Sequence, residues 1–499
     1  MSTSTNVLRK ELLIVETMAL SIGLMSPALA MSAAGAGAAG IVGRAVPLVF
    51  LFAGVGIAFV AYGFIYLSRY YAHAGNAYGL VGVSLGPRSG FVAGWSLLAT
   101  YVLFIPASLL AFGGFISFFL QQTNIWPNAP FVLFSVIGAV VVWVAASIDV
   151  KKLTRGLLGI EGLSVAVILV LMIVVVVRLA NGSAPDGQTF TADVFRFGDG
   201  VDIRTIALGS VFGLLAFAGF EAAASLGEES RNPRRDIPRA LFVAVLTGSI
   251  FFFLCMTVQS LGFGTSAAHV KAFAGSSGPL FDLATTYIAS PVAGVLELGA
   301  AVSALGAALG SATGASRLVL ALSRDGIPRS ALTKVSLKSG APTTALTLVS
   351  ILGVILIFVM ALVGASGLEG WGYLGTLGVL FVIVAYIMVN LGAVRHALRN
   401  RGKKTWMSVA ALSIGILILV YVAFTQIYPV PSAPFSYFPY IAAGWLLIGI
   451  ILVVAAPGLT KRIGTSLARD AGFTDAEKEL QNVQGAAKEA SQFYENEEH

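Results

Sequence analysis

The 499-residue sequence has little charge, few histidines and a single cysteine. Asp, Glu, Lys and Arg make up 11% of the residues, 57% are apolar, and the mean hydropathy is +0.88. A soluble domain of this size needs far more charge, so the composition excludes that class and indicates a protein dissolved in lipid. A lone Cys255 excludes an intramolecular disulfide. The four histidines are scattered and lack metal-ligand spacing.

Motifs for catalysis are missing as well. The sequence contains no Gly-Xaa-Ser-Xaa-Gly element, phosphate-binding loop or catalytic triad pattern, so we expect neither an enzyme nor a cofactor. The run 35–40 formally matches the dinucleotide fingerprint GxGxxG, but it ends an apolar helix and no acid follows at the required distance. We interpret it as close helix packing or a bend. Gly306, Gly310 and Gly314 form two GxxxG steps, which predict close approach of a neighbouring helix.

Long apolar windows recur along the chain. A bilayer core is crossed by about 20 mostly apolar residues in a helix. The twelve predicted spans are 12–40, 46–68, 90–120, 130–149, 156–180, 203–227, 238–263, 290–323, 341–364, 371–394, 406–428 and 437–459. The pattern predicts an all-α integral membrane protein with 12 transmembrane helices.

The basic residues test this count, because cytoplasmic loops retain Lys and Arg. With both termini in the cytoplasm, only five of the 31 lie outside: Arg44, Arg178, Arg196, Arg204 and Lys271. This topology and the anionic inner leaflet explain the net charge of +7, so no nucleic-acid partner is expected. We predict a multi-pass protein of the plasma (inner) membrane, surrounded by lipid, with residues 1–11 as a cytoplasmic N-terminus and 461–499 as a cytoplasmic tail.

Two of the spans carry helix breakers at mid-depth. The first contains Gly23 and Pro27, and the sixth contains Gly213 and Gly219. Unwound backbone at that depth must line a cavity or be buried in protein, and paired interruptions in two halves are typical of secondary transporters. The sequence therefore predicts discontinuous helices 1 and 6 in two inverted repeats.

Acidic side chains inside the spans need a partner or a task, because each costs about 2.5–3.5 kcal/mol at the centre of an inserted helix. Glu221 beside the sixth-helix break and Glu161 in the fifth span are candidates for gating or coupling, with a purely structural bond as the alternative. Glu16 is expected near the inner interface and Glu297 near the outer water. Arg317 is expected to snorkel inward or tie helices together.

A signature at the inner end of the sixth span carries a family resemblance. GFE at 219–221 leads into EESRNPRRDIPRA at 228–240. This resembles the GF[DE]…EE-x-[KR]-NP-x-R-x-IP-x-A pattern of amino acid–polyamine–organocation (APC) superfamily permeases. Residues 69–95 are similar to the segment joining that family's second and third helices, and 317–328 to the end of its eighth. The resemblance extends from about residue 12 to 460.

The resemblance implies a leucine-transporter-like fold that works by alternating access. Its parts would be a first inverted repeat at 12–180, a second at 203–398 and two C-terminal helices at 406–460. It implies a permease for a small amino acid or an organic amine or polyamine, with ion-coupled import. A substrate exchanger and a transporter-like nutrient sensor are the alternatives. A channel would need a continuous polar pathway, which the Leu- and Val-rich spans do not suggest.

The same resemblance places the substrate at the two interruptions. Backbone at 23–27 would face a substrate carboxylate, backbone at 217–220 would line the amine side, and Glu221 aligns with an acid of proton-linked control. The implied substrate-binding residues are Ile22, Gly23, Leu24, Met25, Ser26, Leu215, Phe217, Ala218, Gly219 and Phe220.

The chain departs from the family pattern at two of these places. The first helix has GLMSP at 23–27 where many members have Gly-Ser-Gly or Gly-Thr-Gly, which puts an ordinary carboxylate contact in question. Leu215 stands where many members have a bulky gating aromatic. Phe217 or Phe220 could replace that aromatic.

A third departure leaves the coupling ion open. Ser164 stands where proton-coupled members often have a lysine. Hydroxyls of Ser164, Ser311 and Thr313, with first-helix carbonyls, could then bind Na⁺, a hard ion that suits oxygen ligands. Alternatively Glu161 carries H⁺, or exchange proceeds without a driving ion.

Overall fold

Helices make up nearly all of the computed structural model, as the apolar runs require. It describes residues 14–71, 76–147, 150–198, 200–226, 230–326, 331–336, 341–400 and 405–470. The first helices are α1 Ile14–Met25, α2 Pro27–Val42, α3 Val46–Ser68, α4 Asn76–Leu85, α5 Pro87–Gln122, α6 Phe131–Ser147, α7 Val150–Ala180, α8 Ile203–Phe217 and α9 Pro233–Phe263. The later helices are α10 Ala267–Gly275, α11 Pro279–Tyr287, α12 Ser290–Gly326, α13 Thr343–Leu362, α14 Gly367–Arg399, α15 Thr405–Thr425, α16 Phe438–Ala455 and α17 Pro457–Asp470. Short 3₁₀ helices are η1 Gly43–Ala45, η2 Ala192–Phe195, η3 Phe220–Leu226, η4 Ala331–Thr333 and η5 Phe435–Tyr437, and these ranges contain no β-strand.

The expectation of an all-α membrane protein is confirmed. Within the described residues, nine helical stretches are long and apolar enough to cross a membrane. The first of them, Leu20–Ser68, covers the second expected span and residues 20–40 of the first, and the apolar helices α6 and α8 are shorter. The count of twelve crossings therefore stays a prediction.

Several boundaries differ from the expected spans for local reasons. Helix α14 begins at Gly367 rather than 371, because Ser366 and Glu369 form a reciprocal capping box. Helix α17 takes up the start of the predicted tail, while 471–499 and the predicted N-terminus 1–11 lie outside the described residues.

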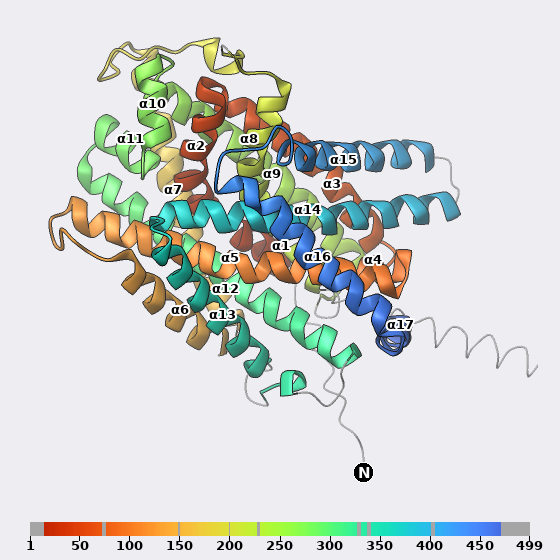
Figure 1. Cartoon of the computed structure of the whole chain (residues 1–499). Coiled ribbons are helices and arrows are strands. Elements are labelled where there is room, and N and C mark those ends of the chain that lie inside the picture. The colour runs from red at the N-terminus through yellow and green to blue at the C-terminus, as the bar shows by residue number, and fades with distance from the viewer. Residues whose placement is uncertain are drawn as a thin grey trace, which may run out of the picture.

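The long helices pack around α5 at the centre of the bundle. Helix α5 packs against α12 and α14, and α3 packs against α9 and α8 (Figure 1). Helices α10 and α11 lie at one end of the bundle, whereas α4 and α17 lie at the other.

Small residues set the close approaches, as predicted for the eighth span. A Cβ on Gly310 would meet Leu24 of α1, and one on Gly314 would meet Tyr101 of α5, although Gly306 has open space. In the 35–40 run, Gly35 and Gly37 likewise face side chains of other elements within the helix α2. The packing interpretation of both glycine runs is confirmed at these positions.

A reciprocal tryptophan pair joins α16 to α5. The rings of Trp95 and Trp445 are stacked, with centroids 4.4 Å apart and planes inclined by 10°. Each indole N–H donates to the backbone carbonyl of the other residue, at 2.9 Å from Trp95 and 3.1 Å from Trp445. Both donors are therefore satisfied inside an otherwise apolar interface.

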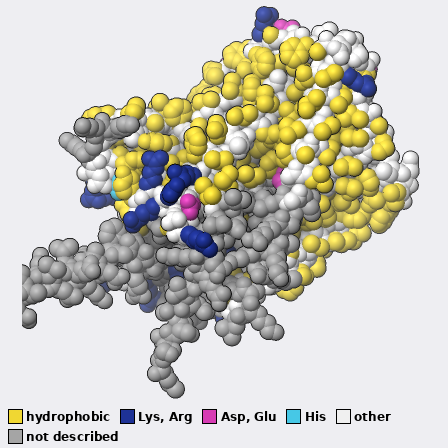
Figure 2. All heavy atoms as spheres, turned by 180° about the vertical axis from the view of Figure 1, so that it is seen from behind, with side chains coloured by type: hydrophobic (Ala, Val, Ile, Leu, Met, Phe, Trp, Pro, Cys, Tyr) yellow, Lys and Arg dark blue, Asp and Glu magenta, His cyan; other side chains and the backbone are white. Residues whose placement is uncertain are grey.

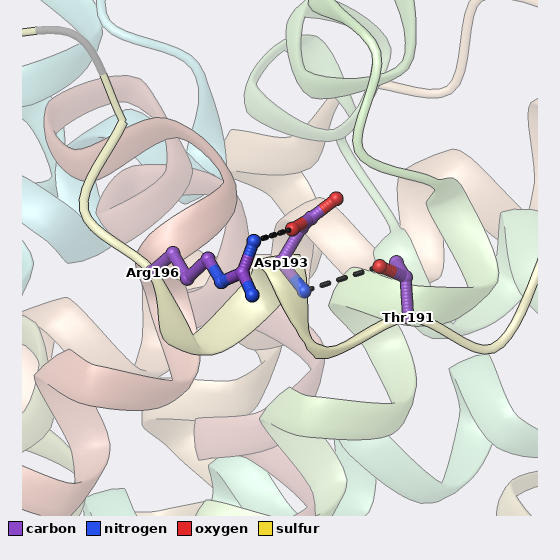
Figure 3. A network of polar contacts seen from close by, with 3 residues as sticks. All are labelled: Thr191, Asp193 and Arg196. Carbon is purple, nitrogen blue, oxygen red and sulfur yellow. Dashed lines mark hydrogen bonds and ion pairs between the residues drawn. The ribbon is translucent and has the colours of Figure 1, made fainter.

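The surface is mostly apolar, as a lipid-facing protein requires. Figure 2 shows hydrophobic side chains over most of one face, with Lys and Arg gathered near its margins. The connection before α8 is polar instead: Asp193 receives a 3.3 Å contact from Arg196, and its backbone N–H donates to Thr191 (Figure 3). Asp202 caps α8 by accepting from the Thr205 N–H and hydroxyl, and these bonds hold the pKa of Asp202 below its ordinary value.

The crossing of α14 and α5 gives a test of the packing. A Cβ on Gly367 would lie 2.6 Å from the Leu110 carbonyl oxygen and 2.8 Å from the Gly114 Cα. We expect Gly367→Ala to lower the free energy of unfolding by about 1–3 kcal/mol, because backbone on both sides must shift. The measurement is the apparent melting temperature of the purified protein in detergent.

The matched control lies in the same helix. A Cβ on Gly372 would have nothing within 4 Å. Gly372→Ala should leave the melting temperature unchanged or slightly higher, since Ala favours a helix interior over Gly by about 0.5–1 kcal/mol. Equal losses in the two variants would contradict the close crossing of α5 and α14.

Candidate functional site

The first predicted interruption lies at Ser26. Helix α1 ends at Met25 and α2 begins at Pro27, and Ser26 between them has a left-handed conformation with φ 45°. The Ser26 hydroxyl donates to the Gly23 carbonyl at 2.8 Å, which satisfies one carbonyl that the end of α1 leaves unpaired. Proline is suited to the first position of α2, because it has no N–H to leave without a partner.

The second interruption follows Phe217, where α8 ends. Ala218 is extended, and Gly219 has φ +101°, a conformation that side chains rarely adopt. A Cβ on Gly219 would lie 2.5 Å from the Leu24 Cγ. The two interruptions are therefore in direct contact, and a glycine is required at this point for both conformation and space.

A small cavity of about 30 Å³ lies between the interruptions. Its lining includes Leu24, Met25, Ser26, Leu215, Ala218 and Ser311 from the predicted set. That volume accommodates about one water molecule, so little space is left between the two breaks.

Two aromatic side chains in the cavity come from helices in which no substrate-binding residue was expected. Phe104 of α5 and Trp371 of α14 line it. Leu215, which stands at the position of the family's bulky gating aromatic, packs toward Gly375 and therefore faces α14. Among the described residues around the cavity, no lining side chain carries a charge.

The remaining predicted substrate residues lie behind the lining. Phe217 is fully buried against Phe252, with ring centroids 5.0 Å apart. Phe220 packs edge-on against Phe64 and Tyr386. Neither phenylalanine lines the cavity, so the structure gives them packing contacts in place of the aromatic role considered for them. Ile22, Gly23 and Gly219 also stand outside the lining.

Glu221 lies at the centre of a buried hydrogen-bond network, on the C-terminal side of the second break. Its carboxylate accepts from the Tyr101 hydroxyl at 2.9 Å, the Tyr386 hydroxyl at 2.7 Å and the Gly219 N–H at 3.0 Å. The Asn76 side chain donates in turn to the Tyr101 oxygen at 3.2 Å. The network joins η3 to α5 and α14, and Glu221 itself is only 1% exposed.

Glu161 occupies the start of α2. Its Oε1 accepts from the Ala28 N–H at 2.8 Å, and the Ser303 oxygen accepts from the Leu29 N–H at 3.1 Å. Ser303 also hydrogen-bonds to the Glu161 carboxylate. Side chains of α7 and α12 thus bind the two unpaired N–H groups that follow Pro27, and the negative charge lies at the positive end of the helix dipole.

A serine links α1 to η3, the segment that follows the second break. The Ser21 hydroxyl of α1 donates to the Phe220 carbonyl at 2.6 Å and accepts from the Ala223 N–H at 3.0 Å. One side chain therefore satisfies two backbone groups of η3 and holds α1 against it.

The three hydroxyls considered for Na⁺ are not brought together. Ser164 lies against Gly299, where an added Cβ would come within 2.7 Å of the Ser164 oxygen. Ser311 lies twelve residues after Gly299 in α12, which is about 18 Å along the helix at 1.5 Å per residue. The hydroxyls of Ser311 and Thr313 are buried and have no hydrogen-bond partner among the described residues.

The other charges within the spans have varied positions. Glu297, expected near the outer water, is only 2% exposed and packs close to Gly278. Nearby Asp282 accepts from the Ser276 hydroxyl at 2.6 Å, and burial raises the pKa of Asp282. Glu16 lies in α1, and its side chain is outside the described part of the chain.

Sequence reasoning missed five polar partners of the site: Ser21, Asn76, Tyr101, Ser303 and Tyr386. Each is a polar side chain in or next to an apolar span, which is the signal that could have marked them. Their partners could not be read from that signal, since Tyr386 and Glu221 are 165 residues apart.

The known proteins that this chain resembles in sequence are permeases and other transporters. The sequence profile of the family described as amino acid permease matches residues 12–454. An uncharacterized transporter of Mycobacterium tuberculosis is 28% identical over 418 residues, which covers 83% of this chain and 82% of the relative. The low-affinity putrescine importer PlaP of Escherichia coli is 27% identical, covering 81% and 85%. The branched-chain amino acid permease BcaP of Bacillus subtilis is 28% identical, covering 54% and 58%.

The Glu221 network can be tested by removing one hydroxyl. We expect Tyr386→Phe to lower the free energy of unfolding by about 1.5–3 kcal/mol, because a buried carboxylate loses a short hydrogen bond. The apparent melting temperature in detergent measures the change. Tyr440→Phe, at a side chain that is 74% exposed, is the control. Similar shifts in both variants would rule out a stabilising role for the bond to Glu221.

Proposed function

The chain belongs to the amino acid permease family, and from this premise we propose that it transports a small amino acid or organic amine across the plasma membrane by alternating access. One observation carries the proposal. Two interrupted helices touch at Leu24 and Gly219, and a cavity lies between their broken ends. Breaks of this kind supply the backbone groups with which transporters bind substrates at mid-membrane.

The architecture proposed for this function is the one implied by the resemblance. It has twelve crossings, inverted repeats at 12–180 and 203–398, two C-terminal helices at 406–460, and both termini in the cytoplasm. In support, α1–α2 and α8–η3 are interrupted at corresponding places. Basic residues also avoid the loops assigned to the outside.

The contacts on the inner side of the cavity act as the gate in this proposal. Ser21 holds α1 to η3, and Glu221 holds η3 to α5 and α14 through two tyrosines. A path to the cytoplasm requires these bonds to exchange for bonds to water or to each other. We assign the gating role to Glu221 for this reason.

For coupling, we propose ion-driven import with two residue sets as candidates. Glu161 or Glu221 would carry H⁺, since each is a buried carboxyl group beside a break. Ser311 and Thr313 offer buried hydroxyls without partners in the described chain, which would suit Na⁺ together with backbone carbonyls. Ser164 is assigned to packing against Gly299.

Uptake into proteoliposomes tests the function. Purified protein should give saturable uptake of a labelled amino acid or amine, and an imposed H⁺ or Na⁺ gradient should stimulate it. Uptake that needs substrate on the opposite side and ignores both gradients would favour the exchanger. Binding without flux would favour the nutrient sensor, and absence of both would contradict the proposal. Protein-free liposomes are the control.

A substitution at the contact between the breaks tests the location of the site. Gly219→Ala should reduce uptake by about tenfold or more, because overpacking against Leu24 costs about 1–3 kcal/mol. Leu24→Ala in the same chain should restore part of the flux by making room.

The control separates steric overlap from backbone strain. Gly364 has φ +79°, yet a Cβ there would meet nothing within 4 Å. Gly364→Ala should retain uptake. Normal uptake by Gly219→Ala would place the substrate site elsewhere.

A further inference from the structure

Both interrupted helices present the start of a helical segment toward mid-bundle, and in both cases a buried glutamate is already bound there. Glu161 accepts from the Ala28 N–H at 2.8 Å, with Ser303 accepting from Leu29. Glu221 accepts from the Gly219 N–H at 3.0 Å. The next N–H of α2, that of Ala30, bonds to the Ser26 carbonyl within the chain. These backbone donors are therefore in use before a substrate arrives.

Two helix C-termini border the cavity, together with Leu29 and Ala30 in the first turn of α2, whose N–H groups are already bound to Ser303 and to the Ser26 carbonyl. Leu24 and Met25 end α1, and Leu215 stands in the last turn of α8, beside Ala218. The last carbonyls of a helix lack intrahelical partners and carry a partial negative charge. Only some of these carbonyls are bound at the breaks: the Ser26 hydroxyl donates to the Gly23 carbonyl, and the Ala218 N–H donates to the Leu215 carbonyl.

The side chains around the cavity also make its surroundings more negative. The described lining contains serine hydroxyls but no lysine, arginine or histidine. Two carboxyl groups, Glu161 and Glu221, lie behind the breaks and are 7% and 1% exposed. Faces of aromatic rings also attract cations, and Phe104 and Trp371 line the cavity.

We propose that the transported substrate is an organic amine without a carboxylate group. This inference rests on the proposed transport function and specifies its substrate class. The ammonium group binds the terminal carbonyls of α1 and α8, and the carbon skeleton lies against Leu24, Phe104 and Trp371. A substrate carboxylate at the start of α2 would find the N–H groups there already bound to Glu161 and Ser303, and it would lie near the Glu161 carboxyl group with no cation in the lining to pair with. Burial of an unpaired charge is strongly unfavourable.

Matched ligand pairs test the proposal, because the members of each pair differ only in the carboxylate. Suitable pairs are isobutylamine with valine, phenethylamine with phenylalanine, putrescine with ornithine, and agmatine with arginine. Binding is measured by thermal stabilisation of the purified full-length protein, and transport by competition in proteoliposomes. We expect at least one amine to bind about tenfold or more tightly than its parent amino acid, a difference of about 1.4 kcal/mol.

Removal of the carboxylate from α2 should change this preference. In Glu161→Ala the Ala28 N–H is released, so an amino acid gains a donor for its own carboxylate and the amine-to-amino-acid affinity ratio falls about tenfold. Because the ratio compares two ligands on one variant, a partial loss of folded protein cancels. Should this variant fail to fold, Glu161→Gln keeps an acceptor and removes the charge, and amine affinity alone should fall.

A surface acid provides the control. Asp193→Asn removes a carboxylate that pairs with exposed Arg196, far along the chain from the breaks, and should leave the ratio unchanged (Figure 3). An equal shift in Asp193→Asn and Glu161→Ala, or an unchanged amine affinity in Glu161→Gln, would overturn the assignment. Preferential transport of amino acids would overturn the substrate class but leave the transport function standing. No saturable binding or flux by either class would overturn both.

Discussion

Backbone groups freed by interrupting a helix must be satisfied inside the protein, because lipid offers them no hydrogen bonds. The chain meets this requirement with its own side chains. Glu161 and Ser303 bind the start of α2, Glu221 binds Gly219, and Ser21 binds both backbone groups of η3 that face it. Each buried carboxylate stabilises a helix start, and the amides at that start stabilise the carboxylate in return.

The two glutamates connect their breaks to different helices. Glu161 brings α7 and α12 to the start of α2, whereas Glu221 brings α5 and α14 to η3 through Tyr101 and Tyr386. The arrangement of the two breaks thus depends on two separate sets of hydrogen bonds. For the alternating access proposed above, one set can be released while the other stays intact, so that the site opens to one side at a time.

Local signals in the sequence predicted the helical architecture and the breaks. Apolar windows marked the spans, Pro27 and Gly219 marked the interruptions, and Glu221 was recognised beside one of them. Pairings over long sequence distances could not be predicted, because Leu29 and Ser303 are 274 residues apart and no local pattern joins them. Helix geometry also separated Ser164 from Ser311, since residue type alone gives no depth along α12. The side-chain direction of Phe217 depended on packing against Phe252.

The paired tryptophans at 95 and 445 have a mechanical consequence. Two N–H···O bonds and a stacked contact must all break before α16 can slide along α5, so this pair fixes the two helices to each other at one point. Any tilt of α5 is then transmitted to α16, whose outer residues such as Val454 are 71% exposed. The tilt of the exposed helix α16 is thereby coupled to the tilt of the central helix α5. Because the thickness of a bilayer influences helix tilt, lipid around α16 can act on α5 through this pair.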